Sequence, residues 1–159
     1  MESQTSNVYT QGLDPNPANY SITYSSGQLT VNKAALSVAA DARTKVYGAA
    51  DPAFTASYSG LVNGEAPAAL GGTLALNRAA GENAGTYSIT PGGLTSPNYS
   101  ITYTPGNLTI TRAPLAVTAH ARTKIYGEPD PALTFEVAGL QFTDTADTAL
   151  TGSLTRAPG

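Results

Sequence analysis

Cysteine and tryptophan are absent from the 159 residues, and histidine and methionine occur once each. Without cysteine the chain cannot build disulfides, thiolate metal sites or a cysteine nucleophile. The single histidine, His120, excludes sites built on paired histidines and leaves little for acid–base chemistry. We therefore expect no enzyme activity, no cofactor and no bound metal.

Charge is also scarce. Only 12% of the residues are charged, about half the usual share of roughly 25%. Eight basic and eleven acidic residues give a net charge of −3, so the chain offers no positive field for nucleic acid or anionic lipid. No apolar run approaches the roughly 20 residues of a membrane span. We expect neither nucleic-acid binding nor membrane insertion.

What the chain does contain is an internal repeat, a strong guide to architecture. Residues 19–61 align with residues 98–140 without a gap, at an offset of 79, and 25 of these 43 residues are identical. The hexapeptide Asn19–Tyr24 recurs unchanged as Asn98–Tyr103. The chain thus holds two periods of one module.

Short alternating segments separated by Gly, Pro and Asn predict antiparallel β structure. Strands are expected around residues 20–24, 29–31, 36–39 and 55–58 and at their counterparts 79 residues later. Residues 25–28 and 104–107 are expected to connect strands as hairpins. Residues 62–70 and 141–150 are less strand-like, and each is expected to hold one helical turn capped by Asn63 and by Thr143 or Asp144. The predicted fold is mainly β: two small tandem antiparallel domains in an elongated array, either Ig-like sandwiches or β-grasp-like.

The position of the domain boundary has two interpretations. We favour units 2–81 and 82–159, because both then end in an Arg-Ala-x-Gly sequence and the chain is used completely. The alternative is one complete repeat, 36–111, flanked by partial repeats 2–33 and 115–159. The first predicts a monomer, whereas the second predicts swapped or head-to-tail association.

Several segments resemble a known family. They are Lys-Val-Tyr-Gly at 45–48 before Asp51-Pro52, Gly60-Leu61, Gly-Thr-Tyr-Ser-Ile at 85–89, and Asn98–Tyr103 followed by Gly-x-Leu-Thr-Ile at 106–110. Together they resemble the YGX-type MBG domain, which occurs in tandem in bacterial surface proteins and filamentous-haemagglutinin-like adhesins. The resemblance implies a cell-surface or secreted location, and it brings no catalytic residues with it.

One recurring corner is a candidate ligand site. It places two cations, a tyrosine and a carboxylate around a Tyr-Gly turn: Arg43, Lys45, Tyr47 and Asp51 in the first copy, and Arg122, Lys124, Tyr126 and Asp130 in the second. The tyrosine could stack on a sugar or peptide while the charges hold its polar groups. The alternative is a structural corner in which Gly supplies a positive φ, Asp caps the turn and Pro sets the exit.

Two other residue groups are not predicted to form binding sites. The alternation of Tyr99 and Tyr103 with Ile101 predicts core packing rather than an exposed recognition row. Asp14, Asp41 and Asp51 do not form the clustered oxygens or loop motif that calcium requires.

These observations favour a non-catalytic stalk or spacer that extends an adhesive domain from a bacterial cell, with neighbouring repeats as its partners. A module that binds a host glycan or protein, through the corner or a strand edge, is a second hypothesis. Self-association is a third.

Overall fold

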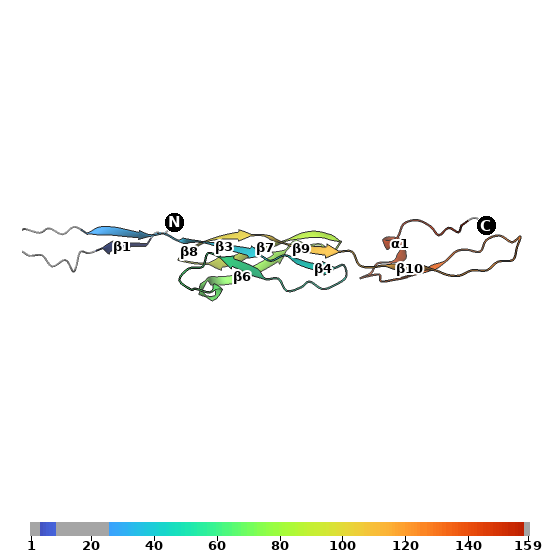
Figure 1. Cartoon of the computed structure of the whole chain (residues 1–159), viewed down its shortest axis with the longest axis horizontal. Coiled ribbons are helices and arrows are strands. Elements are labelled where there is room, and N and C mark those ends of the chain that lie inside the picture. Colours follow the sequence, from blue (N-terminus) through green and yellow to red (C-terminus); the bar gives the residue numbers. More distant parts are fainter. Residues whose placement is uncertain (1–3, 9–25, 158–159) are drawn as a thin grey trace, which may run out of the picture. The chain divides into compact units, whose positions relative to one another are not determined.

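A computed structural model describes residues 4–8 and 26–157 of the chain (Figure 1). The prediction of a mainly β protein is confirmed, because strands separated by turns make up most of the regular structure. The chain divides into two compact units. Unit 1 comprises Met1–Ala40, Ala56–Leu76 and Thr90–Pro105, and unit 2 comprises Asp41–Thr55, Asn77–Ile89 and Gly106–Gly159.

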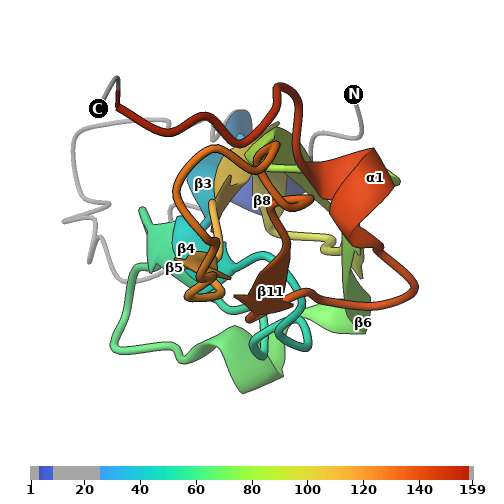
Figure 2. The ribbon, with the colours of Figure 1, turned by 90° about the vertical axis from the view of Figure 1, so that its right-hand side faces the viewer.

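Unit 1 contains a three-stranded sheet in which β3 (Ala34–Ala40) lies between β5 (Ala56–Ser59) and β8 (Tyr99–Thr104). Figure 2 shows β3 and β8 side by side. The alternation of β3 buries Leu36 and Val38 completely, and Tyr99 joins them in the core, which confirms the prediction for this tyrosine. Unit 1 also holds a two-stranded antiparallel sheet of β1 (Gln4–Val8) and β2 (Gly27–Val31).

Tyrosine hydroxyls fix this core. Tyr99 donates to the Glu65 carboxylate at 2.7 Å and accepts from the Val62 amide at 3.0 Å. Tyr103 accepts from the Leu94 amide at 2.8 Å and donates to the Leu94 carbonyl at 3.1 Å. A buried ring with a satisfied hydroxyl adds apolar contact without leaving a polar group unpaired.

A four-stranded sheet has the order β4 (Arg43–Val46), β9 (Gly106–Thr111), β7 (Gly85–Thr95), β6 (Gly71–Arg78). Its strands β6 and β7 contribute residues to both units. In unit 2 the buried side chains Ile89, Leu108 and Ile110 form the core of this sheet. Unit 2 also holds an antiparallel pair of β10 (Ala116–Ala119) and β11 (Phe135–Ala138).

The sheets are mixed rather than wholly antiparallel. β3 runs parallel to β8, and β4 runs parallel to β9, whereas the pairs β3–β5 and β7–β9 are antiparallel. Sequence alternation specifies which face of a strand is buried, but it does not specify the neighbouring strand or its direction. This is why the parallel pairs were not expected.

The hairpin predicted at residues 104–107 is wrong. β8 and β9 are separated only by Pro105, yet they belong to different sheets. Proline lacks the N–H donor that a continuing ladder needs. The chain therefore changes sheets at this residue instead of reversing.

Both predicted helical turns are present, as the 3-10 turn η1 (Pro67–Ala69) and the helix α1 (Ala146–Ala149). Their predicted caps are wrong. Asn63 lies four residues before η1 with a φ of 56°, and Thr145 caps α1 by accepting from the Thr148 amide. Proline at the first position starts η1 without a side-chain cap.

The two domain registers remain predictions. The parallel pairs join 34–39 to 99–104 and 43–46 to 108–111, residues on either side of the boundary expected after Gly81. The alternative unit 36–111 would hold nearly all of these residue pairs within one unit. The expected elongated shape and the choice between Ig-like and β-grasp-like topology also remain predictions.

Some expectations fall outside the described residues, namely the strand at 20–24, Asp14, and Ser25 of the connection expected at 25–28. The remainder of that connection is described, and Gly27 and Gln28 already belong to β2. In the part of the chain that is described, no helix has the length and apolar character needed to cross a membrane.

Candidate functional site

The first corner is held by four charged side chains within unit 2. The ammonium of Lys45, on β4, lies 2.7 Å from Asp51 and 2.5 Å from Glu82. Arg78, at the end of β6, pairs with the same two carboxylates. The Lys45 side chain is only 4% exposed, so its charge depends on these partners. The cluster is neutral overall.

The pKa values of the groups in this cluster are shifted away from neutral pH. Hydrogen bonds from Lys45, followed by those from Arg78, lower the pKa of Asp51 and of Glu82. The Asp51 carboxylate, then Glu82, raises the pKa of Lys45. A general acid or base at neutral pH needs a pKa near 7, and these shifts go in the opposite directions. The first corner is suited to holding the chain together and not to proton transfer.

The second corner repeats part of this arrangement in a more open form. Asp130 lies 2.6 Å from Lys124 and 2.5 Å from Arg156, and all three side chains are 38–46% exposed. Arg156, followed by Lys124, lowers the pKa of Asp130 to about 2. Arg156 thus takes the position that Arg78 holds in the first corner.

The two corner arginines lie beside the base of each loop. Arg43 donates to the Thr55 hydroxyl at 2.6 Å and to the Ala53 carbonyl at 3.3 Å. Arg122 donates to the Thr134 hydroxyl at 2.5 Å. Thr55 directly precedes β5 and Thr134 directly precedes β11, so each arginine binds the residue at which its loop ends.

One residue at the base of the loop differs between the two copies. Asp41 in the first copy is replaced by His120 in the second. The Thr55 hydroxyl donates to Asp41, and Nδ1 of His120 lies 2.9 Å from the Thr134 hydroxyl. His120 therefore takes the place of Asp41 as the hydrogen-bond partner of the threonine hydroxyl.

The two corner tyrosines have different surroundings. Tyr47 donates a hydrogen bond from its hydroxyl to Asp144 at 2.9 Å, and its ring meets Phe142 edge-on, with centroids 5.2 Å apart and planes at 77°. The Asp144 carboxylate raises the pKa of Tyr47. Tyr126, the counterpart of Tyr47, is fully exposed. The same motif is therefore occupied in one copy and open in the other.

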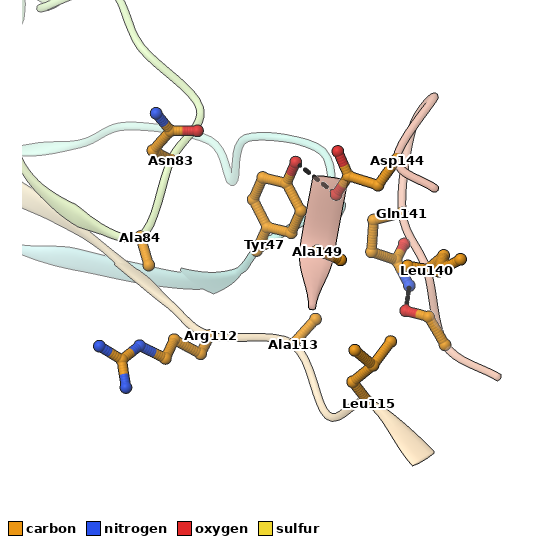
Figure 3. Close-up of a pocket in the computed structure, with 11 residues that line it drawn as sticks. Tyr47, Asn83, Ala84, Arg112, Ala113, Leu115, Leu140, Gln141, Asp144 and Ala149 are labelled. Carbon is orange, nitrogen blue, oxygen red and sulfur yellow. Dashed lines mark hydrogen bonds between the residues drawn. The ribbon is translucent and has the colours of Figure 1, made fainter. Parts of the chain in front are cut away.

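A hollow of about 280 Å³ lies beside Tyr47. Figure 3 shows the Tyr47 hydroxyl directed at Asp144, with Gln141 and Leu140 on one side and Asn83 and Ala84 on the other. The side chain of Arg112 extends away from Asp144 in this view, so it does not form an ion pair there. The walls are mostly apolar, which suits packing better than the binding of a charged ligand.

Phe142 adopts an unusual backbone conformation. Its φ is 50°, and its counterpart in the first copy, Asn63, has a φ of 56°. Asparagine tolerates the left-handed region, whereas a bulky aromatic residue is strained there by roughly 1–3 kcal/mol. The contact between the Phe142 and Tyr47 rings offsets part of this strain.

The structure brings Lys45 and Asp51 together, as well as Lys124 and Asp130, but the sequence reasoning missed their further partners: Arg78, Glu82, Arg156, Asp144 and Phe142. The recurrence of Arg78 as Arg156 was the available signal for the arginines. Nothing in the sequence indicated Asp144 or Phe142, since Tyr47 lies almost 100 residues away from them. The ligand-corner hypothesis itself remains a prediction. Among the described residues no group of three or more His, Cys, Asp or Glu side chains could hold a metal ion.

Comparison with known families identifies the chain. The sequence profile of the MBG domain (YGX type) matches residues 36–109 and again residues 115–159. The chain therefore belongs to the MBG domain family, and the tandem resemblance noted from the sequence is confirmed. The family supplies repeat modules of surface proteins and is not known for enzymatic members. No curated protein and no solved structure matches the chain.

Proposed function

We propose that the chain is a non-catalytic segment of a bacterial surface adhesin, a stalk that extends an adhesive domain from the cell. One observation carries the proposal: the corner of the first matched segment is occupied by a loop of the second. Tyr47 contacts Phe142 and Asp144, and within unit 2 these residues join the segments 36–109 and 115–159.

The joint between the segments is short and closely packed. Five residues, 110–114, separate the two matched segments. Gly48 has no side chain, and a Cβ at this position would lie 2.2 Å from the Gln141 side-chain oxygen. A short connection with side-chain contacts limits hinge motion between repeats, and a spacer must limit such motion to hold its distal domain away from the surface.

Backbone ¹⁵N NMR relaxation tests this role. We expect amides of 36–109 and 115–157 to share one rotational diffusion tensor in the wild-type chain. Tyr47→Ala should uncouple the two sets of amides, whereas Tyr126→Ala, which alters the open corner, should not. Independent tumbling of the two segments in the wild-type chain would contradict the stalk proposal.

A second candidate, binding of a host glycan or protein, is favoured by the open corner. Tyr126 is fully exposed. A hollow of about 280 Å³ is lined by residues that precede and follow Tyr126 in sequence, among them His120, Arg122, Lys124, Asp130, Leu133 and Arg156. An exposed tyrosine offers an apolar ring face for stacking and a hydroxyl for hydrogen bonding. A glycan array and a mucin pull-down test it. Binding that is lost in Tyr126→Ala and kept in Tyr47→Ala would support this candidate.

A further inference from the structure

The four-stranded sheet has two edge strands, β4 and β6, and their edges differ in character. Each of them pairs with a single neighbour among the described residues, β4 with β9 and β6 with β7. Both strands lie inside the region 34–111. An edge strand exposes a row of backbone donors and acceptors that can pair with another chain, unless the strand carries features that prevent it.

The edge of β4 is protected against such pairing. The strand has only four residues, and two of them, Arg43 and Lys45, are charged. Lys45 is buried and forms ion pairs with Asp51 and Glu82. A very short edge strand with a charged side chain directed inward is a common way to prevent pairing with a further strand.

The edge of β6 lacks these features. The strand has eight residues and no proline, and its only charged residue is Arg78, at its end. Gly72, near its start, has a φ of 77°, so the regular part of the strand begins after this residue. The stretch that follows is uncharged up to Arg78. A strand edge of this length without charge or proline is a template for pairing with another strand.

The side chains of β6 define what an added strand must carry. Leu74 and Leu76 are half-buried on one face, and Ala75 between them is exposed on the other. Leu74 packs against the buried core of unit 1. A strand added at this edge would extend the same two faces, so it fits best if it also carries two apolar side chains two residues apart.

The sequence of β6 itself meets this requirement when a second copy of the strand runs antiparallel. With Ala75 facing Ala75 of the second copy, Leu74 faces Leu76 of that copy, and Leu76 faces its Leu74. Apolar side chains directly opposite each other on one face stabilise antiparallel strands. Arg78 faces Gly72 of the second copy, so no like charges oppose each other. The edge is therefore complementary to itself.

We propose that two copies of this chain pair through their β6 edges, antiparallel and about a two-fold axis at Ala75. The same surface on both chains forms the contact, so association ends at a dimer. The two four-stranded sheets become continuous across the interface. This contact joins the chains through the region 34–111, and it is independent of the stalk role.

Single-cysteine variants test the register, because the chain has no cysteine of its own. Ala75→Cys should cross-link to a dimer under mild oxidation, since the two side chains face each other at the two-fold axis. Thr109→Cys is the control for random collision, because Thr109 is also exposed but lies on β9, between two neighbouring strands. Cross-linking of Ala75→Cys at the rate of Thr109→Cys would overturn the proposal.

The mass of the chain in solution provides an independent test. Multi-angle light scattering of the wild-type chain across about a hundredfold range of concentration should show a mass that rises from 16.2 kDa towards about twice that value. A constant mass of 16.2 kDa across the range would overturn the proposal.

A charge exchange at the axis gives the decisive measurement. Ala75→Glu and Ala75→Lys each place two like charges directly opposite each other, so either variant alone should remain monomeric. Mixed in equal amounts, they should form a one-to-one dimer, because opposite charges then face each other. Thr109→Glu should associate like the wild type. Ala75 is exposed, so its variants should keep the wild-type circular dichroism spectrum. Association of either variant alone, or a mixture that stays monomeric, would overturn the proposed interface.

Discussion

At the scale of single residues, the Tyr-Gly corner shows how one motif can serve two environments. Tyr47 is packed and hydrogen-bonded, whereas Tyr126 is open, although the surrounding sequence is nearly the same. The glycines that follow these tyrosines, Gly48 and Gly127, both have a φ of 90°. The positive φ of the glycine is therefore common to both copies of the motif. The contacts of the tyrosine with Phe142 and Asp144 are made in the first copy, where those residues lie beside it.

The two glycines form a matched pair for mutagenesis. Gly48→Ala and Gly127→Ala should each lower the free energy of unfolding by about 1–2 kcal/mol, because a Cβ is strained at this φ. Gly48→Ala should cost more, since its Cβ also displaces Gln141, which donates to the Gly139 carbonyl at 3.0 Å. At Gly127 nothing lies within 4 Å of the added Cβ. Urea unfolding measures the free energy of unfolding of both variants. Equal decreases in the two variants would contradict a contribution from the Gln141 contact.

Asp130 makes stability depend on pH. Its pKa is about 2 in the folded chain, below its ordinary value of 3.8, because Arg156 and Lys124 stabilise the carboxylate. The unfolded state therefore takes up the proton first, so the contribution is complete above about pH 4 and is lost as the pH falls through about 2. The urea midpoint should drop over this interval.

The pH effect has a direct control. Asp130→Asn should reduce the drop between pH 4 and 2, the remainder belonging to carboxylates such as Asp51 and Glu82 whose pKa values are also lowered. Asp147→Asn, at a residue with no ion pair in the described structure, should leave the drop unchanged. Arg156→Gln should raise the pKa of Asp130 measured by carbon-detected NMR titration. An Asp130 that titrates near 3.8 in the wild-type chain would contradict the ion pairing.

At the scale of strands, Tyr103, one of the two tyrosines on β8, connects this strand to β7. The Tyr103 hydroxyl satisfies both the amide and the carbonyl of Leu94. Tyr103→Phe should lower the free energy of unfolding by about 1–3 kcal/mol, because two backbone groups lose their partner. Tyr58→Phe on β5 is the control, since no hydrogen bond of its hydroxyl is found within the described residues. Thermal unfolding of both variants measures the difference. Equal midpoints for the two variants would contradict the predicted contribution of the Tyr103 hydroxyl.

The strands also show how far the sequence predicts the fold. Sequence alternation located β3 and β5, where every second side chain is buried or half-buried, and it also located β10 and β11, although the residues of β10 are all exposed. Alternation did not reveal the parallel pairs or the change of sheet at Pro105, because both depend on which distant strand lies alongside. In the site, the charged pairs within each corner were close in sequence and could be anticipated. The contact of Tyr47 with Phe142 could not, since it depends on tertiary packing.

At the scale of the whole molecule, limited trypsin digestion can decide between the two domain registers. Lys33 and Arg112 are exposed and flank the region whose strands pair from 34 to 111. At low concentration we expect early cleavage after these residues and persistence of a fragment 34–112. The rival register, with units 2–81 and 82–159, predicts early cleavage after Arg78 instead. N-terminal sequencing and mass spectrometry identify the products.

The parallel pairing of β3 with β8 and of β4 with β9 has a mechanical consequence. β3 begins the region 34–111 and β9 ends it. Tension along the chain therefore pulls the start of β3 and the end of β9 in opposite directions. In parallel strands this load acts as shear. The six residue pairs of β3–β8 and the four of β4–β9 then resist together, whereas an antiparallel hairpin pulled at its two ends unzips one pair at a time. The region 34–111 is thus arranged to bear tension along the chain without opening strand by strand.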